Sequence, residues 1–146
     1  MSEKLTMVER VRLAHCFRKA IRRRRWVIDC HTVARIAYLT LKRLGFDPEV
    51  YTGYVVTFAQ RLRVEHTWVE FDGYVVETNP SQIFSLPFPA LIMRKDFWEQ
   101  TVDVIWSRRI EESEMWVLVT QRGREMMEEV AEEIVRCYKK YGVGHG

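Results

Sequence analysis

EHTWVEFDGYVVETNP, residues 65–80, carries the strongest local structural signal in the chain. Both halves of this stretch are rich in aromatic and β-branched residues, and they meet at Asp72-Gly73. Asp-Gly between two such runs is typical of the two-residue turn of a β-hairpin. The stretch therefore predicts two antiparallel strands.

The turn also determines which side chains face each other across the hairpin. If Phe71 pairs with Tyr74, counting outward places His66 directly opposite Asn79. Residues in that relation share a face, with Cβ atoms about 4.5–5.5 Å apart. An amide oxygen that accepts from one imidazole nitrogen fixes the ring and leaves the other nitrogen for a thiol. We therefore expect His66 and Asn79 to act together with an upstream cysteine, Cys30.

Two carboxylates compete with Asn79 as the partner of His66. Glu70 shares the face, but four residues along a strand is about 13 Å, which is beyond hydrogen-bonding reach. Glu77 is a diagonal neighbour at roughly 7–8 Å and is kept as a reserve candidate. Distance thus favours Asn79.

The three cysteines receive different interpretations. Cys30 stands where a helix should begin, with Asp29 as its N-cap, so backbone N–H groups and the helix dipole favour the thiolate. The alternative is that Cys30 is a small buried hydrophobic residue. Cys16 and Cys137 lie among apolar neighbours within predicted helices, and we expect both to be buried free thiols. An odd number of cysteines without framework spacing argues against a disulfide-stapled fold.

The order of predicted elements indicates an α+β fold in a single domain, residues 1–146, because no repeat or linker divides the chain. It comprises N-terminal helices, an antiparallel sheet and a C-terminal helix. The predicted elements are helices over 5–25 and from Cys30 to a stop at Gly45, a strand over Glu49–Phe58, the hairpin of 65–79, an irregular path over 81–98 with a short helical piece at Lys95–Trp98, strands over Val102–Ile110 and Met115–Thr120, and a helix over 123–141.

Composition indicates a globular protein. Hydrophobic residues make up 47% of the chain and charged residues 29%. No apolar run is long enough to span a bilayer, and no signal peptide is evident, so we expect a cytoplasmic protein without membrane association. The chain holds four Gln and one Asn beside abundant Glu, Lys and Arg, a bias found in thermophilic proteins.

Charge is distributed unevenly along the chain. Residues 1–25 hold nine Lys/Arg against two Glu, whereas residues 111–133 hold eight Glu against two Arg. The basic helix could attract an acidic protein partner. The simpler interpretation, which we favour, is that two oppositely charged helices lie near each other. The net charge of +3 disfavours nucleic-acid binding.

Neither a metal site nor a cofactor is predicted. His15-Cys16 and Cys30-His31 supply four potential zinc ligands, but adjacent residues point apart and neither pair has zinc-site spacing. For the same reason His31 cannot readily act as the base for Cys30.

Five motifs follow one another along the chain: Cys30-His31-Thr32-Val33-Ala34, Leu41-Lys42-Arg43-Leu44-Gly45-Phe46, Val50-Tyr51-Thr52-Gly53-Tyr54-Val55, His66-Thr67-Trp68-Val69-Glu70 and Asn79-Pro80-Ser81. This ordered set resembles the transglutaminase-like superfamily, which has a papain-like fold. The resemblance covers about residues 26–82 and implies Cys30 as nucleophile, His66 as base and Asn79 in the position of the orienting acid, where the family usually has Asp.

Taken together, the residues and the resemblance predict a cysteine-dependent enzyme. The expected reaction is acyl transfer or hydrolysis of an amide or peptide bond through a Cys30–His66–Asn79 triad and a thioester intermediate. A peptide or protein would be the substrate. The alternative is a catalytically silent transglutaminase-like domain that binds protein or nucleic acid.

Overall fold

The computed structural model describes residues 5–27, 29–57 and 61–143, with side chains up to residue 140. Phe58, the predicted end of the first strand, lies outside these residues. No helix in the described ranges is long and apolar enough to cross a membrane. The elements are α1 (Met7–Arg22), α2 (Cys30–Arg43), β1 (Glu49–Thr57), β2 (Arg63–Phe71), β3 (Tyr74–Glu77), α3 (Pro80–Phe84), β4 (Leu91–Arg94), α4 (Lys95–Thr101), β5 (Val102–Ile110), α5 (Glu112–Met115) and α6 (Gln121–Val143).

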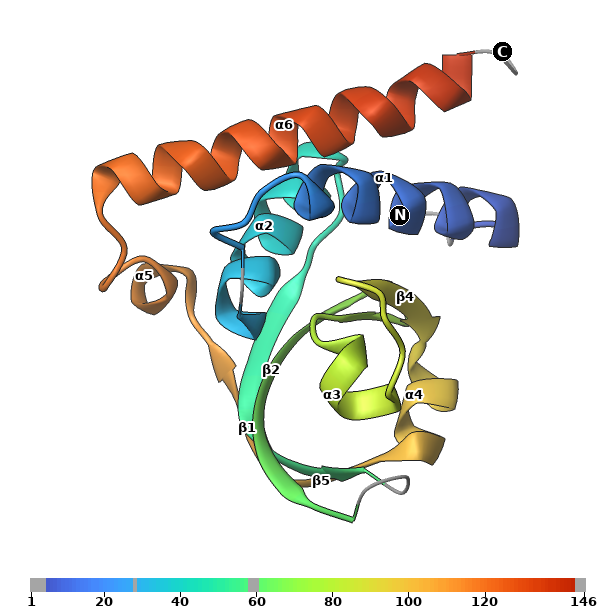
Figure 1. The fold of residues 1–146 in the computed structure, drawn as a ribbon, viewed down its shortest axis with the longest axis vertical. Coiled ribbons are helices and arrows are strands. Elements are labelled where there is room, and N and C mark those ends of the chain that lie inside the picture. The colour runs from blue at the N-terminus through green and yellow to red at the C-terminus, as the bar shows by residue number, and fades with distance from the viewer. Residues whose placement is uncertain (1–4, 28, 58–60, 144–146) are drawn as a thin grey trace.

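The five strands form one antiparallel sheet in the order β4-β3-β2-β1-β5, so the fold class is α+β, as predicted. The sheet is strongly curved (Figure 1), with α1, α2 and α6 on one side and α3 within the curve. Two hydrophobic clusters result from this arrangement. The larger joins the three long helices to the sheet, and the smaller, inside the curve, comprises Val55, Trp68, Val75, Ile83, Trp98 and Val102.

The hairpin prediction is confirmed in its turn and in its register. Asp72 and Gly73 both have positive φ, 50° and 83°, as a type I′ turn requires. Phe71 pairs with Tyr74, and the ladder continues inward to Val69 and Val76. The second strand, however, ends earlier than expected, at Glu77.

Both ends of α2 lie where the sequence predicts them. The side chain of Asp29 accepts a hydrogen bond from the backbone N–H of Thr32 at 2.8 Å, which caps the helix and makes Cys30 its first residue. Gly45 follows the helix with φ of 90°, a conformation that glycine adopts without strain.

Two predictions between the hairpin and α6 are wrong. Residues 115–120, an apolar and β-branched run, form no strand, because Met115 ends α5 and Val117 and Leu118 are exposed. The path over 81–98 is more regular than expected, since it contains α3 and β4. A short apolar run can belong to a strand, a helix or a turn, and its periodicity does not decide between them.

The prediction that Cys16 and Cys137 are free thiols is also wrong. They form a disulfide between α1 and α6, across 121 residues of sequence. Ion pairs also link these two helices, because Arg23 and Arg24, just after α1, both pair with Glu133 on α6. The prediction that the basic and acidic segments lie near each other is therefore confirmed, and some of the basic charge is matched within the chain.

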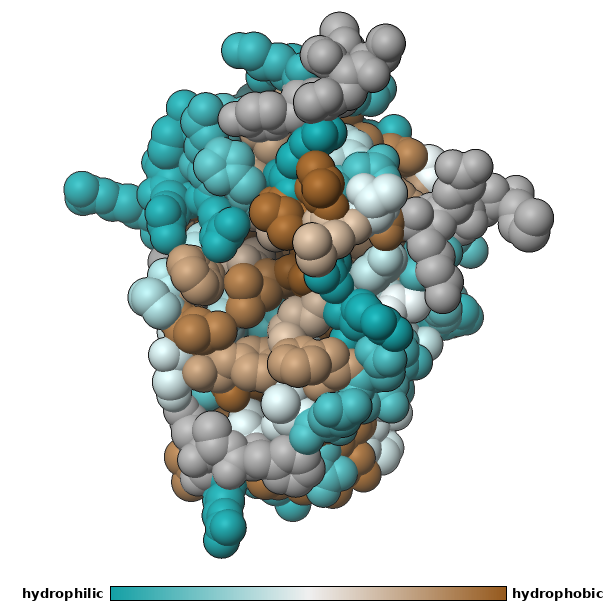
Figure 2. Space-filling model, turned by 90° about the vertical axis from the view of Figure 1, so that its right-hand side faces the viewer, coloured by the Kyte–Doolittle hydropathy of each residue, from teal (hydrophilic) through white to brown (hydrophobic). Residues whose placement is uncertain are grey.

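Surface polarity changes across one face of the molecule. Figure 2 shows hydrophilic side chains toward the top, where α6 lies in Figure 1, and apolar side chains across the middle. Exposed apolar residues of the described chain include Leu86, between α3 and β4, and Phe97 on α4. The alternation of buried and solvent-facing residues along α6 is that of an amphipathic helix, and its apolar side packs on α1 and α2.

The disulfide should contribute substantially to stability. Replacing Cys16 and Cys137 together by alanine removes a cross-link that closes a long loop, so we expect the free energy of unfolding to fall by about 2–5 kcal/mol. Urea denaturation of the double variant and of the oxidised wild-type protein measures this difference. Cys30→Ala is the matched control and should leave the urea midpoint nearly unchanged. Equal midpoints for the wild-type protein and the double variant would show that the cross-link does not stabilise the fold.

Candidate active site

Cys30 is the first residue of α2 and the only free cysteine in the chain, since the other two are bonded to each other. Its side chain is partly exposed and lines a small cavity of about 170 Å³. Asn79, Ser81, Phe88 and Pro89 line the same cavity. The thiol is thus at a helix N-terminus, as predicted, and it lines a small space.

β3 ends early, and beyond its end the start of α2 lies close to β2. The ladder between the two strands covers only Val69–Phe71 of β2, so β3 leaves the preceding part of that edge unpaired. Thr78, which follows β3, donates its hydroxyl proton to the carbonyl oxygen of Thr67 at this edge. The start of α2 meets the same place, because His31 Nδ1 and Thr67 Oγ1 lie 3.0 Å apart. Residues 30–31 and 66–67 are therefore neighbours.

A buried imidazole–carboxylate pair forms the centre of the site. Nε2 of His66 lies 3.0 Å from Oε1 and 2.9 Å from Oε2 of Glu77. Both side chains are completely buried. Isolated charges at this depth would be strongly disfavoured, so each group depends on the other.

The predicted contact between His66 and Asn79 is therefore corrected, because Glu77 takes that place. Asn79 is the N-cap of α3, with its side-chain oxygen accepting from the backbone of Gln82 and from the hydroxyl of Ser81. The physical reason is that β3 ends before position 79, so the hairpin register does not extend there. The separation of roughly 7–8 Å assigned to Glu77 referred to the backbone positions, and two long side chains close that gap.

The Glu77 carboxylate receives two further hydrogen bonds. Nε1 of Trp98, on α4, donates to Oε1 at 3.0 Å, and the backbone N–H of Asn79 donates to Oε2 at 2.6 Å. A carboxylate with this many donors is held in one orientation. Asn79 thus contributes to the site through its backbone, whereas Trp98 is a contributor that sequence reasoning missed.

The electrostatic surroundings favour a protonated His66. Burial is the largest influence and lowers the pKa, but the Glu77 carboxylate and the Cys30 side chain outweigh it and raise the pKa of His66 to about 9. At neutral pH the ring is therefore an imidazolium. Its Nε2–H points to Glu77, which leaves Nδ1 for Cys30.

The contact between Nδ1 and the thiol is close but not a completed hydrogen bond. Nδ1 is buried and has no hydrogen-bond partner among the described residues, although Cys30 is near enough to raise the pKa of His66. Catalytic hydrogen bonds are often long in the absence of substrate and shorten when it binds. The arrangement thus bonds His66 to Glu77 and places Cys30 near the same ring.

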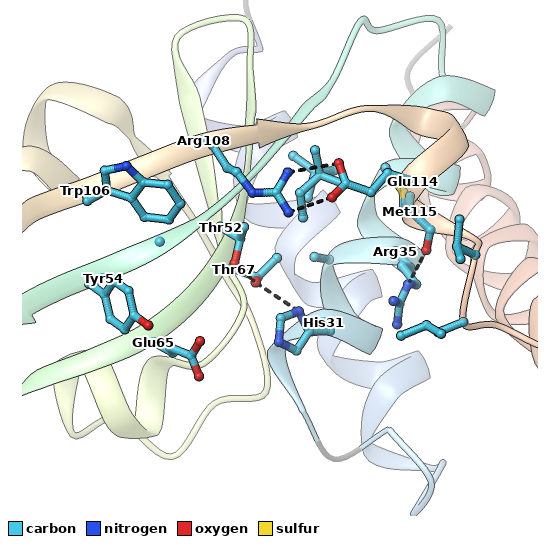
Figure 3. A pocket seen from close by; sticks show the side chains of 16 residues that line it. His31, Arg35, Thr52, Tyr54, Glu65, Thr67, Trp106, Arg108, Glu114 and Met115 are labelled. Carbon is cyan, nitrogen blue, oxygen red and sulfur yellow. Dashed lines mark hydrogen bonds and ion pairs between the residues drawn. The ribbon is translucent and has the colours of Figure 1, made fainter.

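A second cavity lies beside these residues, on the other side of the start of α2. It has a volume of about 550 Å³ and is lined by His31, which follows Cys30, and by Glu65 and Thr67, which flank His66 (Figure 3). Among the described residues, no group of three or more His, Cys, Asp or Glu side chains is placed to hold a metal ion.

Comparison of the chain with models of protein families, with curated proteins and with solved structures found no match. The site is therefore interpreted from its own geometry. One local signal could have identified Glu77 in advance. Asn79-Pro80 is a typical helix start, with Asn as N-cap and Pro at the first helical position, and it predicts that Asn79 has left the strand.

The buried pair should make stability depend on pH. The pKa of His66 in the folded protein, about 9, exceeds the 6.5 of an unfolded histidine, so the stabilisation is complete below about pH 6.5 and is lost as pH rises through about 9. Urea unfolding between pH 6 and 10 should show this loss for the wild-type protein. Glu77→Gln should lower stability by about 3 kcal/mol at pH 6 and flatten the profile.

The matched control for Glu77→Gln is Asn79→Ala. It removes only the N-cap side chain of α3, which is worth about 1 kcal/mol, and should keep the pH dependence. The reverse result, a flat profile for Asn79→Ala and an unchanged one for Glu77→Gln, would contradict the assignment of Glu77.

Proposed function

We propose that this chain is a cysteine-dependent enzyme that transfers or hydrolyses acyl groups, with Cys30 as nucleophile, His66 as acid and base, and Glu77 as the residue that orients and charges His66. The observation that carries the proposal is a buried imidazole–carboxylate pair, His66 and Glu77, with a thiol at a helix N-terminus near the imidazole. A nucleophile, a base and an orienting group in that order are the parts that thiol catalysis requires.

The reaction begins from an ion pair between the Cys30 thiolate and the His66 imidazolium. The thiolate attacks the carbonyl carbon of an amide, and the backbone N–H of Cys30, in the first turn of α2, donates to the oxygen that becomes negative. His66 gives its Nδ1 proton to the departing amine as the C–N bond breaks. Cys30 is left as a thioester.

The second half of the reaction regenerates the thiolate. A thioester sulfur carries no charge, so one of the influences that raise the pKa of His66 is lost and more of the ring is in the neutral form, which can accept a proton. It accepts a proton from water, or from an amine acceptor, as that molecule attacks the thioester. The C–S bond breaks, the acid or new amide departs, and the thiolate again faces the imidazolium.

The family to which we assign the chain is the transglutaminase-like superfamily with its papain-like fold. Support comes from the order of the motifs and from the placement of Cys30 at the start of a helix beside a strand that carries His66. Glu77 takes the role that the family gives to an Asp. Peptide hydrolysis is the reaction that we favour within this class.

Alkylation of Cys30 tests the proposal without a known substrate. Iodoacetamide reacts with thiolates, and Cys30 is the one free thiol, so the oxidised wild-type protein needs no other cysteine change. We expect His66→Ala to slow alkylation at pH 6 by about tenfold or more, because the ion pair is lost. Mass spectrometry after timed quenching measures the rate.

Asn79→Ala serves as the control and should alkylate at nearly the wild-type rate. A catalytically silent binding domain predicts a different result, in which Cys30 reacts slowly at pH 6 and His66→Ala changes nothing. That outcome would overturn the proposed chemistry.

A further inference from the structure

The 550 Å³ cavity has the properties of a binding site for an apolar group. Most of its wall is apolar, and three of its residues are large hydrophobic side chains left in solvent: Trp106 is 51% exposed, Val117 73% and Leu118 91%. Exposed apolar residues gathered at one cavity are typical of a surface that binds a ligand or another chain.

Its walls come from segments that are far apart in the sequence. Trp106 on β5 and Tyr54 on β1 stand at one end, whereas Met115 of α5 and Arg35 of α2 stand at the other (Figure 3). The ring centroids of Tyr54 and Trp106 are 6.3 Å apart, and Nε of Arg35 donates to the carbonyl oxygen of Met115 at 3.0 Å. Both ends of the cavity are thus held in place by contacts within the chain.

A chain of hydrogen bonds connects residues that line the cavity to the catalytic histidine. Thr67 Oγ1 donates to Thr52 Oγ1 at 3.0 Å, and Thr52 Oγ1 donates to the carbonyl oxygen of His66 at 3.3 Å. Because both hydroxyl protons are used in this way, Nδ1 of His31 is the donor to Thr67 Oγ1. Figure 3 shows His31 and Thr67 joined at the centre of the view, between the aromatic end and Arg35.

The cavity and the thiol lie on two sides of the same helix start. Cys30 lines the 170 Å³ cavity and the next residue, His31, lines the 550 Å³ cavity. An extended peptide advances about 3.3–3.6 Å per residue, so a chain crossing the start of α2 would present neighbouring side chains to the two spaces. The smaller space admits a small residue, and the larger admits a bulky one.

The polar groups of the cavity suit a peptide backbone. Arg108 and Glu114 form a two-bond ion pair, at 2.9 and 2.6 Å, and so neutralise each other. Arg35 has no ion-pair partner among the described residues and is only half buried, so its terminal N–H groups can donate to a peptide carbonyl oxygen.

We infer that the 550 Å³ cavity is the specificity pocket of the enzyme and receives a bulky aliphatic or aromatic side chain of a peptide substrate, one or two residues from the bond attacked by Cys30. This inference rests on the proposed function, because it takes Cys30 as the point of attack. It adds the substrate class, an extended peptide with a large apolar residue beside a small one.

A peptide scan tests the pocket. The probes are capped heptapeptides of alanine and glycine in which leucine, phenylalanine or aspartate occupies each position in turn. We expect leucine or phenylalanine at one position to raise kcat/KM by about tenfold over alanine, a gain typical of a small hydrophobic subsite, and aspartate there to give none.

Leu118→Asp should abolish that preference, because it places a charge at the rim of the pocket. Leu62→Asp is the matched control, since Leu62 is also exposed (59%) and does not line the cavity, and it should leave the preference intact. An unchanged preference in Leu118→Asp, or cleavage by the wild-type protein without any preference, would overturn the inference.

A binding measurement tests the pocket independently of the proposed reaction. Calorimetric titration of Cys30→Ala with the same peptides requires no turnover. In one outcome the wild-type protein cuts no peptide, Cys30→Ala binds the leucine probe about tenfold more tightly than the alanine probe, and adding Leu118→Asp removes this difference. That result supports the pocket and shows that the proposed reaction is wrong. If neither cleavage nor selective binding occurs, the pocket is wrong as well.

Discussion

The buried pair of His66 and Glu77 is the interaction on which the site and much of the fold depend. A pair of this kind is no more stabilising than well-packed apolar side chains of the same size, because removing two charges from water offsets most of their attraction, but losing one partner alone is costly. The pair does require that both side chains be placed accurately. Glu77 is held by the indole of Trp98 and by the backbone of Asn79, so β2, β3, α4 and the start of α3 must all assemble for the pair to form. The site is thus tied to the smaller hydrophobic cluster inside the curve of the sheet, to which Trp98 belongs.

The shortness of β3 links the local sequence to the site. The type I′ turn starts the strand, and the Asn79-Pro80 helix start ends it after four residues. Glu77 is the last residue that the strand can present to His66. Beyond it, β3 no longer pairs with β2, and Thr67 in this part of β2 contacts His31 at the start of α2. The change from strand to helix at Asn79-Pro80 therefore positions the Glu77 carboxylate and leaves room for the Cys30 thiol.

Much of this could be predicted from residues 29–80, where local signals agree with one another. Asp29 and Gly45 mark both ends of α2, and Asp72-Gly73 fixes the hairpin register. The partner of His66 was missed because register is a rule for backbones in a ladder, and Asn79 lies past the end of the ladder. The Cys16–Cys137 disulfide was missed because cysteine spacing carries no information about two helices that meet after 121 residues. The strand assigned to Met115–Thr120 failed because composition alone does not reveal that no neighbouring strand is there to pair with it.

The central claim is that Glu77 keeps His66 protonated inside the protein at neutral pH. Nitrogen NMR of histidine-labelled protein, titrated from pH 5 to 11, observes the two ring nitrogens of His66 directly, with His66→Ala providing the assignment. The account predicts that both nitrogens carry protons at pH 7 and that the ring titrates near pH 9. A neutral His66 at pH 7, titrating at or below the 6.5 of an unperturbed histidine, would contradict it.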